Sequence, residues 1–168
     1  MWNYAFIDWQ NLYLWTSSEW WNIDLDKFRI YLKDKYKVSK AYYFLWYIQD
    51  ENNSLYTRVQ EAWFIVIFKK QMVNMTTAKK WNIDSDMIFR IMEKLIEKPD
   101  KFEKIVIVSG DGDFKILVDY LIKKWRLKKV LFPNKKYASS LYNDLLNENF
   151  AYLKDAKTKI EYKKREGT

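Results

Sequence analysis

Short runs of apolar residues alternate with helical patterns along this chain, and this alternation is the feature that most restricts its fold. Near-continuous apolar runs occur at positions 4–7, 41–45, 64–68 and 105–108. Such runs are typical of strands buried on both faces, whereas half-exposed strands alternate apolar and polar residues. Buried strands separated by helices indicate a central, mostly parallel sheet covered on both sides. The sequence therefore predicts an α/β fold with three layers, α/β/α.

Periodicity and turn residues assign most of the chain to a single domain. The predicted strands are Tyr4–Asp8, Lys40–Leu45, Phe64–Phe68, Lys104–Val108, Lys129–Phe132 and Phe150–Leu153. The predicted helices are Asp24–Tyr36, Asn53–Ala62, Ser85–Glu97, Phe114–Lys124 and a short one at Ser139–Leu146. Residues 69–80 are polar and unpatterned, which indicates a loop or a small hairpin. We place the domain at 1–153 and a basic tail, helical or disordered, at 154–168.

The strand predicted at 104–108 ends in a turn of small residues that carries two aspartates, Asp111 and Asp113. Ligands of open α/β sheets bind beyond the carboxyl ends of the strands, which is where this turn lies. Two carboxylates beside a buried strand are costly unless a cation or a hydrogen-bond network compensates them. The turn therefore predicts a divalent-metal site.

The chain contains neither cysteine nor histidine. This absence excludes disulfides, thiolate catalysis, Cys-ligated zinc and histidine-dependent catalytic triads. An active site must then use carboxylates, hydroxyls, amides and lysines, and carboxylates suit Mg²⁺ or Mn²⁺. The sequence has no apolar stretch of membrane-spanning length and no N-terminal signal pattern, so we expect a cytoplasmic protein that does not contact a membrane.

Four aspartates are expected to meet at one edge of the sheet. The predicted catalytic and metal-binding residues are Asp8, Asp84, Asp111 and Asp113. Asn11, Ser109 and Asp86 are predicted to support them by orienting a carboxylate or a water molecule. Each aspartate alone has a simpler interpretation as a strand end or a helix cap. Together they favour phosphodiester hydrolysis assisted by one or two Mg²⁺ or Mn²⁺ ions.

The formal net charge of +8 is concentrated in two segments. Residues 123–136 hold seven bases and no acid, and the tail holds six bases against three acids. A basic face beside an acidic pocket favours a nucleic acid whose backbone the lysines hold, although a solvated lysine surface explains the charge equally well. The predicted nucleic-acid-binding residues are Lys123, Lys124, Arg126, Lys128, Lys129, Lys135 and Lys136.

Nine tryptophans and three glycines make an unusual composition, because average usage of about 7% would give roughly 12 glycines. Trp63 and Trp125 each follow a predicted helix at the position where glycine is preferred. Trp9 and Trp81 flank the predicted acidic pocket, and Trp20 lies in a loop. We hypothesise that eight of the nine tryptophans, all except Trp21, are glycines encoded by UGA, as in bacterial lineages that read this codon as glycine. A tryptophan-rich protein with stacking platforms for bases is the alternative.

Three segments carry motifs in a fixed order. The segment 6–12 resembles F-I-D-G-x-N-L with Trp9 in place of glycine, and the segment 80–86 resembles K-G-x-x-D-x-D/E with Trp81 in place of glycine. The segment 108–114 matches V-S-G-D-G-D-F without change. In these motifs the chain resembles the NYN family, the LabA-like branch of the PIN-like nucleases. The resemblance implies a PIN-like (Rossmann-like) fold. It also implies an Mg²⁺- or Mn²⁺-dependent ribonuclease centred on the four aspartates, with Asn11 in support.

Two other functions are weighed against an endoribonuclease acting on single-stranded or structured RNA. A non-catalytic RNA-binding or regulatory module that keeps the fold is the first alternative. A phosphatase with Asp8 as nucleophile is the second, but the D-x-D pattern typical of such enzymes is lacking at Asp8-Trp9-Gln10. The sequence leaves open the RNA substrate, the number of metal ions and the oligomeric state, a homodimer included.

Overall fold

The computed structural model of this chain describes residues 1–45, 53–68 and 83–163. Its centre is a six-stranded sheet in the order β3-β2-β1-β4-β5-β6. The strands are β1 (Asn3–Asp8), β2 (Val38–Leu45), β3 (Ile65–Phe68), β4 (Ile105–Val108), β5 (Leu127–Phe132) and β6 (Phe150–Tyr152). Every neighbouring pair is parallel, which confirms the parallel sheet predicted from the continuous apolar runs.

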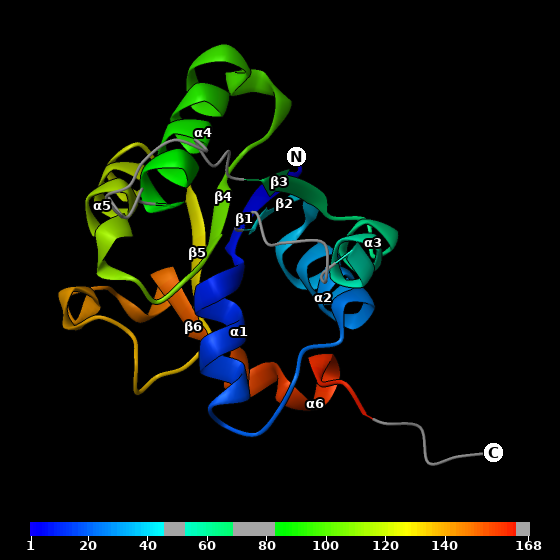
Figure 1. Ribbon diagram of the computed structural model, residues 1–168. Helices are drawn as coiled ribbons and strands as arrows, with labels where there is room; N and C mark the ends of the chain where they lie inside the picture. Colours follow the sequence, from blue (N-terminus) through cyan, green and yellow to red (C-terminus); the bar gives the residue numbers. More distant parts are fainter. Residues whose placement is uncertain (46–52, 69–82, 164–168) are drawn as a thin grey trace, which may run out of the picture.

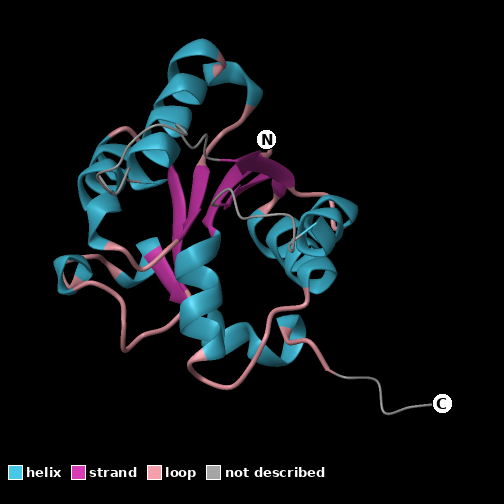
Figure 2. Ribbon diagram, viewed as in Figure 1, coloured by secondary structure: helices cyan, strands magenta, loops and turns pink. Residues whose placement is uncertain are grey.

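Helices cover both faces of this sheet, as Figures 1 and 2 show. The helices are α1 (Trp9–Ser17), α2 (Leu25–Tyr36), α3 (Asn53–Glu61), α4 (Ile83–Glu97), α5 (Lys115–Lys123) and the short α6 (Lys157–Ile160). In Figure 1, α4 and α5 lie on one side of the strands, while α2 and α3 lie on the other. The three-layer α/β/α fold is therefore present.

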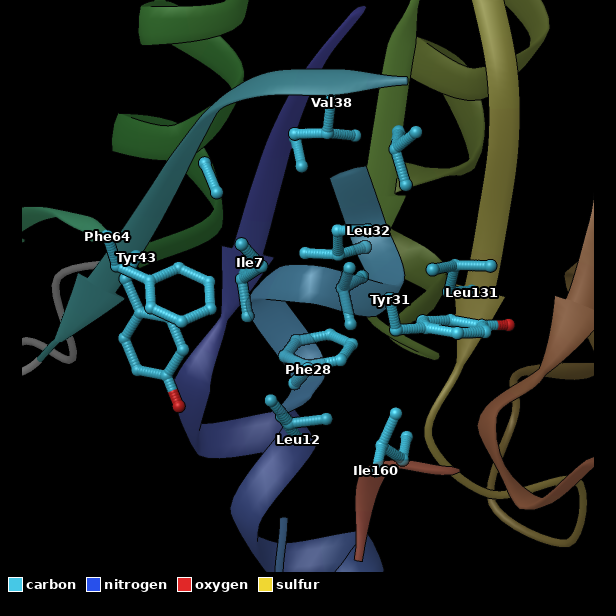
Figure 3. Close-up of a cluster of buried hydrophobic side chains, with 14 of the residues drawn as sticks. Ile7, Leu12, Phe28, Tyr31, Leu32, Val38, Tyr43, Phe64, Leu131 and Ile160 are labelled. Atoms are coloured by element: carbon cyan, nitrogen blue, oxygen red, sulfur yellow. The ribbon is translucent and has the colours of Figure 1, made fainter. Parts of the chain in front are cut away.

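Alternate residues of β1 feed two separate hydrophobic cores. Ala5 and Ile7 belong to the core that contains Phe28 of α2, shown in Figure 3. Tyr4 and Phe6 belong to the core that contains Met87 of α4 and Val118 of α5. Because successive side chains of a strand point to opposite faces, one continuous apolar run supplies both layers.

The order of the strands puts a topological switch point between β1 and β4. From β1 the chain moves outward through β2 to β3, then returns to β4 and moves outward the other way through β5 to β6. Connections leave the carboxyl ends of β1 and β4 in opposite directions, which opens a crevice where ligands of such sheets bind. Asp8 ends β1, and Ser109 follows β4 directly.

The structure differs from the prediction in two segments. Helix α1 was not predicted, because its sequence lacks a clear amphipathic spacing; it starts where Asp8 caps it through the backbone N–H of Asn11. The helix predicted at Ser139–Leu146 is wrong, since this region holds only the 3₁₀ turns Ser140–Tyr142 and Asn147–Asn149. Leu141 and Leu146 are exposed, so these leucines supply no apolar face for a helix to bury.

The segment expected as a basic tail begins with residues that pack on the domain. Leu153, Ala156 and Ile160 are buried in the α2 core, and Glu161 bridges to Ile23 between α1 and α2. Residues 164–168 lie outside the described residues, as does the loop or hairpin predicted at 69–80. Among the helices described, none is both long and apolar enough to cross a membrane.

Candidate active site

Asp8 lies at the carboxyl end of the central strand and is 5% exposed. One carboxylate oxygen, Oδ1, accepts the backbone N–H of Asn11 at 3.2 Å, and the other, Oδ2, accepts the hydroxyl of Ser109 at 3.1 Å. Burial raises the pKa of Asp8 above its ordinary value, while these hydrogen bonds oppose that rise. The nearby Asp111 carboxylate adds a smaller increase to the pKa of Asp8. The sequence thus folds into a buried carboxylate with a second carboxylate close to it.

Ser109 connects Asp8 to the turn after β4. Its side chain is fully buried; its hydroxyl donates to Asp8 and accepts the backbone N–H of Asp111 at 3.1 Å. Asp111 in turn accepts the backbone N–H of Asp113 through Oδ1 at 3.0 Å. The two strands of the switch point are therefore joined by one continuous hydrogen-bond chain from Asp8 through Ser109 to Asp111.

Asn11 fixes the same turn from α1. Its side-chain carbonyl accepts the backbone N–H of Gly110 at 2.8 Å, while its own backbone N–H donates to the Asp8 carboxylate. Asn11 and Ser109, which were predicted to support the carboxylates, thus both form a hydrogen bond with Asp8. Both residues hold backbone groups in place as well as carboxylates.

The two glycines of the turn are needed for space and not for an unusual backbone angle, because neither has a positive φ. A Cβ on Gly110 would lie 3.3 Å from the Ala138 Cα, and one on Gly112 would lie 2.6 Å from the Ser139 hydroxyl. The segment that follows β5 therefore packs directly against the turn. Its residue Tyr142 donates its hydroxyl to the Asp111 carbonyl at 2.6 Å.

The other predicted acids are placed differently. Asp113 is exposed at the start of the 3₁₀ turn Gly112–Phe114. Asp86 lies on α4 with Oδ1 3.9 Å from the Arg90 guanidinium. The backbone of Asp84 belongs to the first turn of α4, but its side chain lies outside the described residues. Within 1–45, 53–68 and 83–163, no three acidic side chains come close enough to hold an ion together.

The basic residues of the 123–136 segment are divided between two ends of the sheet. Five of them lie between the last residue of α5 and the first three residues of β5, namely Lys123, Lys124, Arg126, Lys128 and Lys129. Since Leu127 pairs with Ile105 at the amino end of β4, these five lie about 10 Å along the strands from the Asp111 end. Lys135 and Lys136 follow the carboxyl end of β5 and are exposed on the segment that packs against the turn. The continuous basic face expected beside the acidic pocket is not formed by this segment.

Arg126 and Lys129 are also engaged in holding the fold. The Arg126 guanidinium donates to the carbonyls of Pro99 and Phe102, and the Lys129 ammonium donates to the carbonyl of Glu148. Their charge therefore has a structural use in addition to any contact with a ligand.

Comparison with known families assigns this chain to a family. The family model of the NYN domain matches residues 4–145, a span that contains Asp8, Asn11 and the whole turn after β4. The chain belongs to the NYN domain family. NYN domains have a PIN-like nuclease fold, and the parallel sheet flanked by helices agrees with it. No match to this NYN domain was found among the curated proteins.

A solved structure has the same fold over nearly the whole length of this NYN domain. It is the crystal structure of a protein of unknown function from Vibrio parahaemolyticus RIMD 2210633, with a TM-score of 0.74 and 20% sequence identity. The similarity covers 95% of this chain and 95% of that one. At this identity the likeness concerns the fold alone.

Tyr142 and Ser139 are the site residues that the sequence did not reveal. Both lie about 30 positions after the turn and touch it only because β5 returns the chain beside β4. The spacing of Tyr142 from any acid carries no signal. Only the parallel pairing of the strands identifies it.

Three of the tryptophans hypothesised to be glycines have a left-handed backbone. Trp63 and Trp125 have φ angles of 64° and 57°, and Trp20 has 61°. Their side chains are 81%, 83% and 96% exposed, so none is held there by packing. Trp21, in contrast, is 5% exposed and belongs to the α2 core. Trp46 and Trp81 lie outside the described residues. Trp2, Trp9 and Trp15 have no positive φ, so their backbones give no support to the exchange.

Proposed function

We propose that this NYN domain is an endoribonuclease that hydrolyses RNA phosphodiester bonds with Mg²⁺ or Mn²⁺. The observation that carries the proposal is the chain of contacts from Asp8 through Ser109 to Asp111 at the switch point of the sheet. Carboxylates held at that place by fixed hydrogen bonds are suited to chemistry on a ligand in the crevice.

The residues at this site have the chemistry to bind a divalent cation, because they are carboxylates. Asp8 and Asp111 are close enough for one carboxylate to raise the pKa of the other, and bringing a cation between them would relieve that repulsion. Asp8 and Asp111 would hold the ion, and we propose Asp84 and Asp113 as further ligands. When bound, Mg²⁺ or Mn²⁺ polarises the phosphate and stabilises charge on the leaving oxygen.

The protein's own residues prepare this site. Ser109 and the backbone of Asn11 keep Asp8 oriented and favour its ionised form against the effect of burial. Tyr142 and Asn11 hold the backbone of the turn, so that Asp111 keeps one position beside Asp8. Fixed donors and carboxylates of this kind reduce the reorganisation needed during reaction.

We propose that Lys135 and Lys136 bind the RNA backbone near the carboxylates. They are exposed on the segment that packs on the turn, so a strand that reaches Asp111 passes close to them. The five basic residues at the amino ends of the strands would contact RNA only if it continues around the edge of the domain. This divides the basic residues into a near pair and a remote set.

We also propose that this protein belongs to the LabA-like branch and that eight tryptophans are glycines in the protein made from its natural gene. The positive φ angles at Trp20, Trp63 and Trp125 support the exchange, since glycine adopts this conformation without the cost that other residues have. The buried Trp21 is the exception, as its side chain fills part of the core.

The deciding experiment is cleavage of single-stranded and structured RNA with Mn²⁺ or Mg²⁺. We expect the parent, with glycine restored at the eight positions, to cleave RNA, and Asp111→Asn to lose at least 100-fold in rate with unchanged thermal stability. Metal-independent cleavage, or equal rates in the two proteins, would contradict the nuclease. RNA binding without cleavage would instead support the non-catalytic RNA-binding module that keeps the fold.

A further inference from the structure

A cavity of about 360 Å³ opens beside the start of α1, on the α2 side of the sheet. Residues from α1, β2, α3 and the segment after α6 line it, and its polar or aromatic lining includes Trp9, Tyr13, Asn22, Tyr43, Arg58 and Tyr162. Trp9 follows Asp8 directly in the chain, and Tyr43 lies on the strand that pairs with β1. The cavity is therefore next to the candidate active site but separate from its hydrogen-bond chain.

Tyr43 is a buried residue whose hydroxyl is available to this cavity. The residue is 2% exposed and lines the cavity, and no residue of the described part of the chain forms a hydrogen bond with its hydroxyl. In Figure 3 the hydroxyl points towards α1. Burial, followed by the charge of Asp8, raises the pKa of Tyr43, so the hydroxyl stays protonated and can donate. Within the described residues the fully buried side-chain atoms that lack a partner are Trp21 Nε1 and Arg126 Nε, so the Tyr43 hydroxyl is open to the cavity, where it can donate to a ligand.

Arg58 supplies a positive charge at the same cavity. It is exposed on α3, and no acid within the described ranges forms an ion pair with it. The Asn22 side chain adds a donor and an acceptor, since only its backbone carbonyl is engaged, with the N–H of Tyr162. These groups match a ligand with hydrogen-bonding edges and a negative charge.

Two tyrosine rings provide faces for stacking. Tyr13 and Tyr162 are half exposed and both line the cavity. Trp9 stacks on the Tyr13 ring with 5.1 Å between ring centroids and 19° between planes, so an aromatic plane is already accepted there. Bases stack on such rings irrespective of sequence.

We propose that this cavity binds one nucleobase of the RNA strand whose phosphate lies at Asp8, with Tyr43 donating to the base edge and Arg58 contacting the adjoining phosphate. The proposal rests on the proposed nuclease function for its choice of strand. The cavity has the size of a small-ligand pocket, its charge is complementary to a nucleotide, and its position is adjacent to Asp8. A glycine at position 9 would uncover the Tyr13 face for the base.

Binding of labelled RNA octamers (A, C, G or U) in EDTA tests this directly. EDTA removes divalent metal, so RNA binding is measured without metal-dependent cleavage. A failure of RNA binding can then be told apart from a failure of RNA cleavage. We expect Tyr43→Phe to weaken binding about fivefold and Tyr162→Ala about tenfold. Binding constants measured at several salt concentrations give a slope of log K against log salt concentration. Arg58→Gln is expected to reduce the magnitude of this slope by about 0.7. Lys101→Gln, a charge-matched control at the amino end of β4, is expected to change the affinity less than twofold.

The outcomes separate the alternatives. Thermal unfolding of each variant first confirms that it is folded; Tyr43→Phe removes only one hydroxyl. Affinities equal to that of the parent in Tyr43→Phe, Tyr162→Ala and Arg58→Gln would overturn the proposal, as would a parent that binds no octamer. Mononucleotides that bind as tightly as octamers would also overturn it, because the occupant would then be a free nucleotide. Base-dependent binding that is lost in the variants supports it even if the parent fails to cleave RNA.

Discussion

Ser109 donates its hydroxyl to Oδ2 of Asp8 across 3.1 Å, although 101 positions separate the two residues in the chain. The same hydroxyl accepts the backbone N–H of Asp111, so one buried atom links the ends of β1 and β4. The position of one candidate ligand is thereby tied to the position of the other.

Ser109→Ala is expected to lower the rate of RNA cleavage about 10- to 100-fold. Asp8 loses a donor that favours its ionised form, so the pKa of Asp8 rises further. As the pH is lowered, activity that needs the ionised carboxylate is then lost sooner. The acidic limb of the pH–rate profile therefore moves to higher pH. The pH profile measures this, with Ser17→Ala as a control, because the half-buried Ser17 donates only within α1. An unmoved acidic limb would contradict the assigned role of Ser109.

Asp8→Asn is expected to abolish cleavage while stabilising the fold at neutral pH, by on the order of 1 kcal/mol. The pKa of Asp8 is raised in the folded protein, so ionisation is penalised by folding and the penalty is fully present above that folded pKa. As pH falls through the folded pKa, the parent becomes protonated and the advantage of the variant shrinks. Urea unfolding between pH 4 and 8 measures the difference, and a parent more stable than the variant at neutral pH would refute it.

Tyr142→Phe is expected to reduce the cleavage rate about tenfold with a loss of stability of only about 1 kcal/mol. The change removes the 2.6 Å hydrogen bond to the Asp111 carbonyl and leaves the ring packed on Phe132. A looser turn should raise the Mn²⁺ concentration needed for half-maximal activity, which a purely structural role would leave unchanged. Tyr120→Phe on α5 is the matched control, and equal metal midpoints in the two variants would argue against positioning.

Trp63→Gly and Trp125→Gly are each expected to stabilise the protein by about 1 kcal/mol, because glycine relieves the left-handed backbone and little packing is lost. Trp21→Gly should destabilise it by at least 3 kcal/mol through the cavity it leaves. Lys37 has a φ of 55°, so Lys37→Gly measures the stability gained from glycine at a left-handed position that holds no tryptophan. Chemical denaturation gives these values. The gene provides an independent check, since UGG codons at the eight positions would disprove the glycine proposal.

Replacing both Lys135 and Lys136 with glutamine is expected to weaken RNA binding more than the same change at Lys123 and Lys124. Both pairs remove two charges, but only the first follows the carboxyl end of β5. When affinity is measured at several salt concentrations, the slope of log K against log salt concentration should fall in magnitude by about 1.4 for the first pair. A larger effect at the second pair would place the RNA at the amino ends of the strands and away from Asp111.

The sequence by itself determined the layers of this protein and the residues able to do chemistry. Continuous apolar strands such as 105–108 can only be buried on both faces, which predicts a parallel sheet between helices. The lack of histidine and cysteine left carboxylates as the reactive groups. Helix ends at Trp63 and Trp125 could be read locally, because a chain that leaves a helix for a strand often needs a left-handed residue.

The tertiary structure alone decided which of these residues meet. Strand order placed Asp8 beside Ser109 and brought the segment with Tyr142 onto the turn, whereas it set Lys123 to Lys129 at the far end of the sheet. Local patterns carry no information on strand order or on which end of a strand a charge occupies. Those relationships arise from contacts between residues 30 to 100 positions apart, and such contacts depend on the burial of the whole core.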